Sequence, residues 1–167
     1  KGNASYLSNT LLEYGNESGY ADLDSFQGIG TITRAENGHP FPFFYGYKTA
    51  GIFQTLDEVN SYVNAEGKPV QPNAQPGDVR FVDVNGDGLI DNNDRTDIGN
   101  GTPKWTYGIN FNASWKGLDF NMFWQGVAGV DVFDATHRTD IASSNYPSWM
   151  LGRWTGPGTS NKIPRLF

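Results

Sequence analysis

The segment 83–94, DVNGDGLIDNND, holds oxygen-bearing side chains at the spacing of a cation-binding loop. Asp83, Asn85 and Asp87 stand at loop positions one, three and five, and Asp94 stands at position twelve. A hard cation such as calcium takes about six to eight oxygen ligands, including a main-chain carbonyl at position seven and a direct or water-mediated ligand at position nine. The pattern therefore predicts a structural calcium site formed by Asp83, Asn85, Asp87, Leu89, Asp91 and Asp94.

The same segment also fits an acidic, glycine-rich turn whose carboxylates are solvated. Gly88 at position six permits a sharp turn in either case. Asp94 is shorter than the usual Glu at position twelve, which favours binding through one oxygen. No helical pattern flanks the loop on both sides, so the sequence does not indicate an EF-hand switch.

Catalytic groups are not arranged in any recognisable pattern. His39 and His137 are far apart in the sequence, and no cysteine is present. The 18 Asp and Glu residues include no pair that the sequence singles out as an acid and a base. We therefore expect that the chain is not an enzyme.

Charge and length restrict the class further. The net charge is −6, and the 12 Lys and Arg residues are scattered, which disfavours a nucleic-acid partner. The 167 residues fit one domain or a piece of one, and no apolar run is long enough for a transmembrane helix. The chain opens without Met, so we interpret it as a single fragment, 1–167, of a longer protein.

The elements around the acidic loop are predicted to be short. Residues 1–40 suggest two or three short strands, and the region 41–80 suggests a strand followed by a short loop helix. Aromatic residues alternate at Phe41, Phe43, Tyr45 and Tyr47, with the period of a strand. The T-x-x-E pattern that begins at Thr55 is a capping box, which predicts the start of the helix.

Residues 105–125 have the most regular pattern and predict a hairpin with a two-residue turn at Lys116-Gly117. A soluble sandwich would give this alternation, with the apolar face inward. The opposite face, however, is mostly uncharged and polar, and Trp residues stand near the strand ends, as in the wall of a membrane barrel. The apolar positions of the first strand are Trp105, Tyr107, Ile109, Phe111, Ala113 and Trp115.

The segment 136–167 has no periodicity and is rich in turn-forming residues, which predicts a long loop with one helical turn near Trp149. Trp149 and Trp154 could stack on sugar rings or pack within their own loop.

Three stretches together resemble the SusC/RagA family of TonB-linked outer-membrane transporters. They are FYGYKTAGIFQ at 44–54, the long stretch from PGDVRFVDVNGDGLIDNND to WQGVAGVDVFD at 76–134, and RWTGPGTSNKIPR at 153–165. The resemblance implies a large β-barrel in the cell outer membrane, energised through TonB and closed by a SusD/RagB-type surface lipoprotein that captures glycans or peptides. No plug or TonB box is present, so the chain is similar to a C-terminal portion, which could not transport alone.

The resemblance also implies roles for individual segments. The apolar positions of 105–115 would face lipid, while the acidic loop and 136–167 would lie in extracellular connections. Trp149, Arg153 and Trp154 would meet the substrate or the lipoprotein. The expected fold is mainly β: antiparallel strands and hairpins of an outer-membrane β-barrel, with long loops and one or two short helices. The alternative function is a soluble calcium-binding β-domain that recognises carbohydrate.

Overall fold

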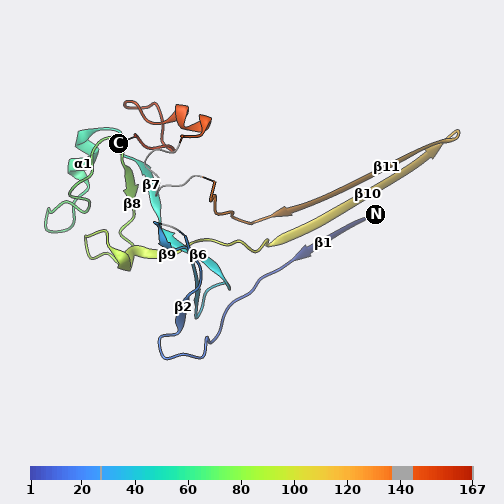
Figure 1. The fold of residues 1–167 in the computed structure, drawn as a ribbon, viewed down its shortest axis with the longest axis horizontal. Coiled ribbons are helices and arrows are strands. Elements are labelled where there is room, and N and C mark those ends of the chain that lie inside the picture. Colours follow the sequence, from blue (N-terminus) through green and yellow to red (C-terminus); the bar gives the residue numbers. More distant parts are fainter. Residues whose placement is uncertain (27, 137–144, 167) are drawn as a thin grey trace. The chain divides into compact units, whose positions relative to one another are not determined.

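A computed structural model describes residues 1–26, 28–136 and 145–166 (Figure 1). The described chain is mainly antiparallel β-structure with a few short helices, as predicted. It divides into two compact units, each described separately below. Unit 1 comprises Lys1–Phe44 and Gly99–Asp134, and unit 2 comprises Tyr45–Ile98 and Ala135–Phe167. Within the described ranges, no helix has the length and apolar character needed to cross a membrane.

The longest element of unit 1 is the predicted hairpin. Strand β10 (Trp105–Trp115) pairs antiparallel with β11 (Leu118–Ala128) in an unbroken register. The turn residues Lys116 and Gly117 have φ of 47° and 86°, the positive values that a tight hairpin turn requires. The hairpin is confirmed, and β11 runs three residues past the predicted end at 125.

Strand β1 (Gly2–Tyr6) pairs antiparallel with β10 and completes a sheet of order β1-β10-β11. Its register places Tyr6 opposite Trp105 and Gly2 opposite Ile109. Its residues alternate between Gly2, Ala4 and Tyr6 on one face and Asn3 and Ser5 on the other.

The rest of unit 1 is built from short strands, more numerous in residues 1–40 than the two or three predicted. β2 (Tyr20–Asp22) pairs with β5 (Thr33–Glu36), and β3 (Ser25–Phe26) pairs with β4 (Gly30–Thr31). β6 (Phe43–Tyr47) begins alongside β5 through Phe43 and Phe44. Ala35 and Phe43 are buried and form the small core.

Unit 2 contains the predicted helix. α1 (Leu56–Ser61) starts at Thr55, whose hydroxyl accepts a hydrogen bond from the Glu58 amide at 3.2 Å. The Glu58 carboxylate in turn accepts a hydrogen bond from the Gln54 amide at 2.7 Å. The capping box is therefore confirmed, with the return bond one residue before the expected position.

The core of unit 2 contains the buried side chains of Ile52, Phe53 and Val70, and the Phe53 ring lies 5.8 Å from that of Tyr62, which follows α1. β7 (Thr49–Ile52) pairs antiparallel with β8 (Val79–Phe81), and the Tyr62 hydroxyl donates to the Phe81 carbonyl at 2.8 Å. β9 (Arg95–Gly99) lies beside β6. Two 3₁₀ helices complete the unit, η1 (Asn92–Asp94) and η2 (Ser148–Gly152).

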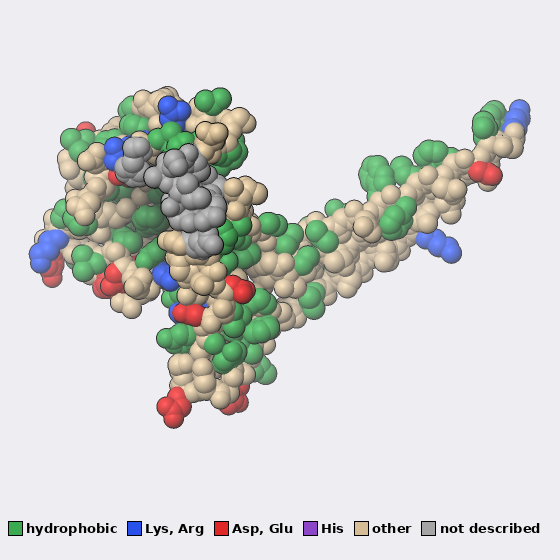
Figure 2. All heavy atoms as spheres, viewed as in Figure 1, with side chains coloured by type: hydrophobic (Ala, Val, Ile, Leu, Met, Phe, Trp, Pro, Cys, Tyr) green, Lys and Arg blue, Asp and Glu red, His purple; other side chains and the backbone are tan. Residues whose placement is uncertain are grey.

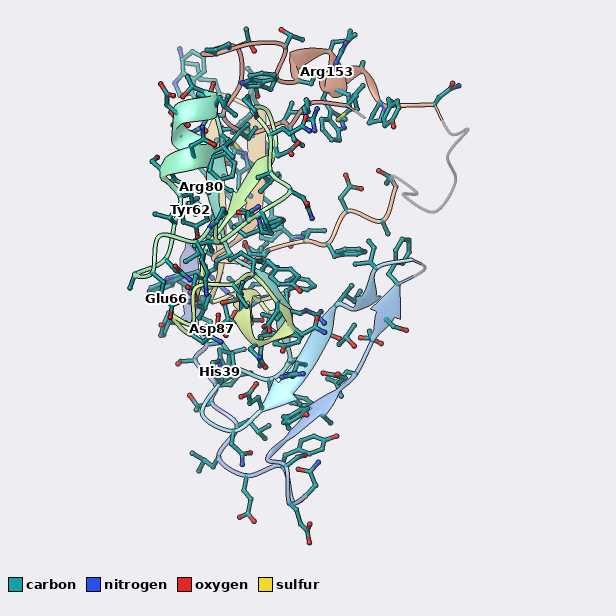
Figure 3. All side chains as sticks on the ribbon, turned by 90° about the vertical axis from the view of Figure 1, so that its left-hand side faces the viewer. His39, Tyr62, Glu66, Arg80, Asp87 and Arg153 are labelled. Atoms are coloured by element: carbon teal, nitrogen blue, oxygen red, sulfur yellow. The ribbon has the colours of Figure 1, made fainter. Side chains whose placement is uncertain are left out.

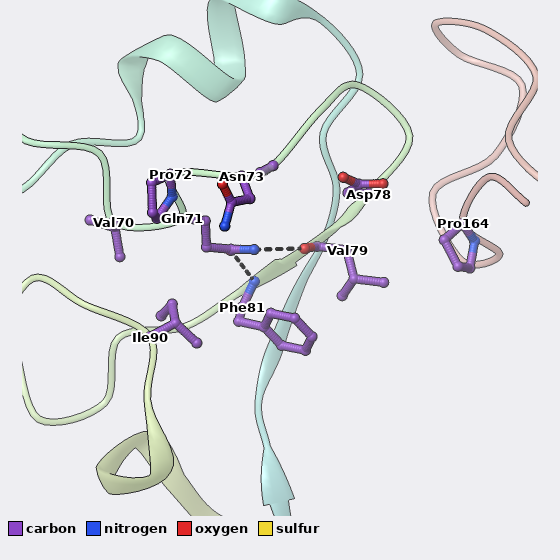
Figure 4. Close-up of a pocket in the computed structure, with 10 residues that line it drawn as sticks. Val70, Gln71, Pro72, Asn73, Asp78, Val79, Phe81, Ile90 and Pro164 are labelled. Carbon is purple, nitrogen blue, oxygen red and sulfur yellow. Dashed lines mark hydrogen bonds between the residues drawn. The ribbon is translucent and has the colours of Figure 1, made fainter. Parts of the chain in front are cut away.

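A side-chain amide caps the outer edge of β8 (Figure 4). Gln71 donates to the Val79 carbonyl at 3.2 Å and accepts from the Phe81 amide at 2.8 Å. Gln71 thus occupies the backbone carbonyl and amide that a neighbouring strand would otherwise bond. This protects the edge of β8 against pairing with another strand. A pocket of about 460 Å³ lies here, lined mainly by apolar side chains such as Val79 and Phe81.

Candidate functional site

The sheet β1-β10-β11 presents one continuous apolar face. Residues paired across the strands point to the same side of an antiparallel sheet, so the register decides which side chains share a face. The six apolar positions of β10 stand opposite Leu118, Phe120, Met122, Trp124, Gly126 and Ala128 of β11. The Phe111 and Phe120 rings are 6.2 Å apart, and the Tyr6 and Trp105 rings are 4.8 Å apart.

This apolar face is open to the surroundings. Trp105, Tyr107, Ile109, Phe111 and Trp115 are between 46% and 67% exposed, and Ala113 is exposed as well. In Figure 2, hydrophobic side chains lie along the hairpin with few charges between them. A contiguous apolar surface of this extent marks a contact with protein or lipid.

The opposite face is mainly polar. It carries Asn110 and Asn112 from β10 and Asn121 and Gln125 from β11, and Ser114 donates to Asp119 at 2.6 Å. Phe123, opposite Asn110, departs from the predicted pattern. Val127, opposite Thr106 and past the predicted end of the hairpin, also places an apolar side chain on this face. The apolar side is therefore interrupted only at Gly126 of β11, and the polar side is interrupted at Phe123 and Val127.

The acidic loop 83–94 is folded by bonds to its own backbone. The Asp83 carboxylate accepts from the Gly86 and Gly88 amides at 2.6 and 2.7 Å. Asn85 accepts from the Asp87 amide, and Asp87 accepts from the Leu89 amide, both at 2.9 Å. These are the side-chain-to-backbone bonds of consecutive Asx turns.

Asp94 closes this loop from inside. Its side chain is fully buried, and its two oxygens accept from the Val84 amide at 2.7 Å and the Asp91 amide at 2.8 Å. The Asp91 carboxylate accepts a hydrogen bond from the Asn93 amide at 2.7 Å, and this bond caps the start of η1. One carboxylate therefore ties the beginning of the loop to its end.

The pKa of Asp94 reflects two opposing effects. Burial raises the pKa, but hydrogen bonds from the backbone of Asp91, Val84 and Asn85 stabilise the ionised carboxylate and lower it. The net pKa lies below the ordinary value of 3.8, so Asp94 is charged at neutral pH.

The predicted calcium ligands do not form a cage in this geometry. Within the described residues, no three acidic, His or Cys side chains gather where they could share a metal ion. The oxygens of Asp83 and Asp87 are directed at backbone amides, although each carboxylate oxygen keeps a second lone pair. Calcium binding stays a prediction, and the described loop is an Asx-rich turn.

The predicted partner residues lie in different environments. Trp149 is on η2 and is 52% exposed, close in sequence to the exposed Leu151. Arg153 follows η2 and is half-buried. Trp154 is also half-buried, and its indole Nε1 donates to Gln54 at 3.1 Å. Residues 137–144 and 167 of the predicted loop lie outside the described residues.

Gln54 is a structural residue that the sequence reasoning missed. Its side chain donates to the Ile52 and Ser160 carbonyls, both at 3.0 Å, and accepts from Trp154 and from the Gly158 amide. It therefore joins β7 to the segment 154–160, about one hundred residues later. No local periodicity could have indicated this contact.

Two further links join the same parts of unit 2. Asn161 accepts from the Ile52 amide at 3.0 Å, and Arg165 forms a 2.7 Å ion pair with Asp78. These residues belong to, or stand beside, the three stretches on which the family resemblance rests. Those stretches thus come together, in part, as one hydrogen-bonded assembly.

No protein-family model matches the chain. Three receptors from Formosa agariphila do match it. TonB-dependent receptor P39 is 30% identical over 200 residues, covering 98% of this chain and 18% of the receptor. TonB-dependent receptor P26 is 28% identical over 162 residues, covering 94% of this chain and 16% of that receptor. TonB-dependent receptor P3 is 29% identical over 129 residues, covering 77% of this chain and 12% of that receptor.

This chain is homologous to TonB-dependent receptors. The resemblance inferred from the sequence is confirmed at that level. The chain spans between 12% and 18% of the length of these receptors. The SusC/RagA type, the substrate and the partners therefore belong to the proposal that follows.

Proposed function

We propose that the chain is part of the wall and external loops of an outer-membrane β-barrel, in a nutrient importer of SusC/RagA type. The observation that carries this proposal is the exposed apolar face of β1-β10-β11, backed by a mainly polar face. A barrel wall needs this arrangement, because one face meets hydrocarbon and the other lines a polar interior. The homology to TonB-dependent receptors favours this function over a soluble carbohydrate-binding domain.

The connections give the sheet an orientation. Tyr6, Trp105 and Ala128 share one end, from which the long segments 7–104 and 129–167 leave, whereas the other end is closed by the two-residue turn at Lys116. Outer-membrane barrels have short periplasmic turns and long extracellular loops. Lys116 therefore faces the periplasm, and unit 2 belongs to the extracellular loops.

The absence of native cysteines in this chain allows a direct test of the orientation. Ala65 is exposed in unit 2, so Ala65→Cys in the full-length receptor should react with a membrane-impermeant maleimide on intact cells. Lys116→Cys should react only after the outer membrane is permeabilised. Labelling of Lys116→Cys but not Ala65→Cys on intact cells would refute the orientation. Any cysteines elsewhere in the receptor are replaced beforehand.

The partners follow from the proposed type of importer. TonB would act through a part of the receptor outside this chain, and a SusD/RagB-type lipoprotein would cover the extracellular side. The exposed side chains of Tyr146, Trp149 and Leu151 support a partner-facing role for η2, because aromatic residues often anchor interfaces. Trp154 instead supports the fold of unit 2 through Gln54. The transported substrate is an oligosaccharide or a peptide.

Calcium is a separate part of the proposal. The ligand spacing of 83–94 supports it, and binding would require Asp83, Asn85 and Asp87 to direct lone pairs to a common point. Calorimetry on the detergent-purified, chelator-treated receptor should detect heat on adding millimolar calcium. Asp87→Asn should weaken that signal, and Asp57→Asn, an exposed position of α1, should not. No heat with the folded receptor would leave only the acidic turn.

A further inference from the structure

A second pocket in unit 2 is lined by polar groups and differs in character from the apolar pocket beside Gln71. Its volume is about 450 Å³, within the size range of ligand-binding sites. Its lining includes Glu58 of α1, Arg80 of β8 and the segment around Ser160 and Asn161. No residue of the acidic loop and none of η2 contributes to its lining.

Arg80 supplies a fixed positive charge to this pocket. Side chains alternate along β8, so Val79 and Phe81 line the apolar pocket while Arg80 lines the polar one. Arg80 is half-buried, and its guanidinium lies 6.0 Å from the centre of the Tyr62 ring (Figure 3). In the described part of the chain, it forms no hydrogen bond or ion pair. A guanidinium has five donors and no acceptor, which suits a carboxylate.

Glu58 supplies a negative charge to the same pocket without neutralising Arg80. One oxygen of its carboxylate accepts from the Gln54 amide at 2.7 Å, which holds the group in place. No ion pair joins Glu58 and Arg80 among the described residues, although both line one pocket. The second carboxylate oxygen of Glu58 is therefore available as an acceptor for a ligand hydroxyl.

Asn161 completes the set as a donor. Its carbonyl oxygen accepts from the Ile52 amide at 3.0 Å, which fixes the side chain and leaves its NH₂ group available. The pocket thus offers a cation, a hydroxyl acceptor and an amide donor. Hydrogen bonds to the backbone hold the acceptor Glu58 and the donor Asn161, and the guanidinium of Arg80 lies over the Tyr62 ring. Among the described residues of its lining, only Ala50 and Ile52 have aliphatic side chains, so an apolar ligand would gain little there.

We propose that this pocket binds an acidic sugar residue, with the sugar carboxylate on Arg80 and its hydroxyls on Glu58 and Asn161. The assignment rests on the proposed function, and it selects acidic oligosaccharides among the possible substrates. A sugar hydroxyl both donates and accepts hydrogen bonds, so it can donate to the Glu58 carboxylate and accept from the Asn161 amide. The carboxylate matches Arg80, which the described chain leaves without an anion.

The test compares trigalacturonate with its fully methylated ester, which differs mainly by the loss of charge. Both are titrated into the full-length receptor in detergent, with binding measured by calorimetry and ligand-detected NMR. The native receptor should prefer the acid. Arg80→Gln should weaken acid binding about tenfold or more, as expected for the loss of a charge-assisted bidentate contact, and remove the preference over the ester. Glu58→Gln, which keeps an acceptor for Gln54, should weaken both ligands.

Lys162→Gln is the matched control, because it removes the same charge at an exposed position beside Asn161 that does not line the pocket. It should change acid binding less than twofold. Equal binding of acid and ester by the native receptor, no binding of either, or equal losses in Arg80→Gln and Lys162→Gln would each overturn the proposal. If the receptor still assembles as an outer-membrane barrel, any of these three outcomes would contradict only the proposal for the pocket. Failure of the barrel to assemble would count against the proposed function.

Discussion

At the scale of single residues, Asp94 is the strongest determinant of the acidic loop. The sequence placed it in the loop as a terminal calcium ligand, because only its spacing was visible. The structure shows a buried carboxylate that bonds the amides of Val84 and Asp91. Burial depends on how the loop folds back, which local spacing does not reveal.

We expect Asp94→Asn to loosen the loop even without calcium. One carboxylate oxygen becomes an NH₂ group, which would face a backbone amide and leave a buried donor without an acceptor. The cost should be about 1–3 kcal/mol. Hydrogen exchange measured by mass spectrometry on the chelator-treated receptor should show faster exchange across 84–91. Asp87→Asn keeps an acceptor for Leu89 at an exposed site and should exchange almost as the native receptor does.

Acid should have a related effect on the native loop. The pKa of Asp94 is lower in the folded loop than its ordinary value of 3.8, so folding favours the ionised form. Its contribution is fully present above pH 3.8 and declines as the pH falls through the lowered folded value. Exchange of the loop amides, corrected for the intrinsic pH effect, should therefore rise only in that acidic range. If exchange of the loop amides rose equally with acid in Asp94→Asn, protonation of Asp94 would not be the cause of the rise.

At the scale of elements, the sequence predicted those that have a strong local signal. The capping box at Thr55 located α1, and strict alternation located β10 and most of β11. The predicted end at 125 was too early because Gly126 interrupts the apolar pattern. A Cβ there would lie 2.5 Å from the Tyr107 ring, so the glycine makes room for this aromatic side chain of the neighbouring strand β10. The short strands predicted within residues 1–40 were not located individually, and β1 carries little apolar signal because Gly2, Ala4 and Tyr6 are the residues on its apolar face.

The hairpin turn gives the second stability prediction. Gly117 has φ of 86°, and no atom lies within 4 Å of a Cβ built there. Gly117→Ala should therefore be destabilising through backbone strain alone, by about 1–2 kcal/mol. Gly2→Ala is the control within the same sheet, since its Cβ would meet only the Gly108 carbonyl at 3.6 Å, an ordinary contact. Urea unfolding of the assembled receptor should separate the two variants, and equal midpoints would contradict the strain.

At the scale of the whole molecule, local patterns were insufficient. Unit 2 combines 45–98 with the segment after 135, and its links run through Gln54, Asn161 and the Asp78–Arg165 pair. These side chains have no periodicity, and their partners are distant in the sequence. The resemblance to a transporter family indicated that the stretches belong together without indicating how they contact one another. Trp154 is accordingly a packing residue, and Trp149 keeps the exposed position expected of an interface.

The central claim is that the apolar face of β10 contacts lipid. The most direct measurement is labelling of single cysteines by a bilayer-confined maleimide in the full-length receptor in outer membranes. Tyr107→Cys and Phe111→Cys should react, since both positions lie on the exposed apolar face. Asn110→Cys and Asn112→Cys, on the opposite face, should react only with a water-soluble maleimide. Protection of positions 107 and 111 from the bilayer probe, with reaction at 110 and 112, would contradict the barrel-wall account.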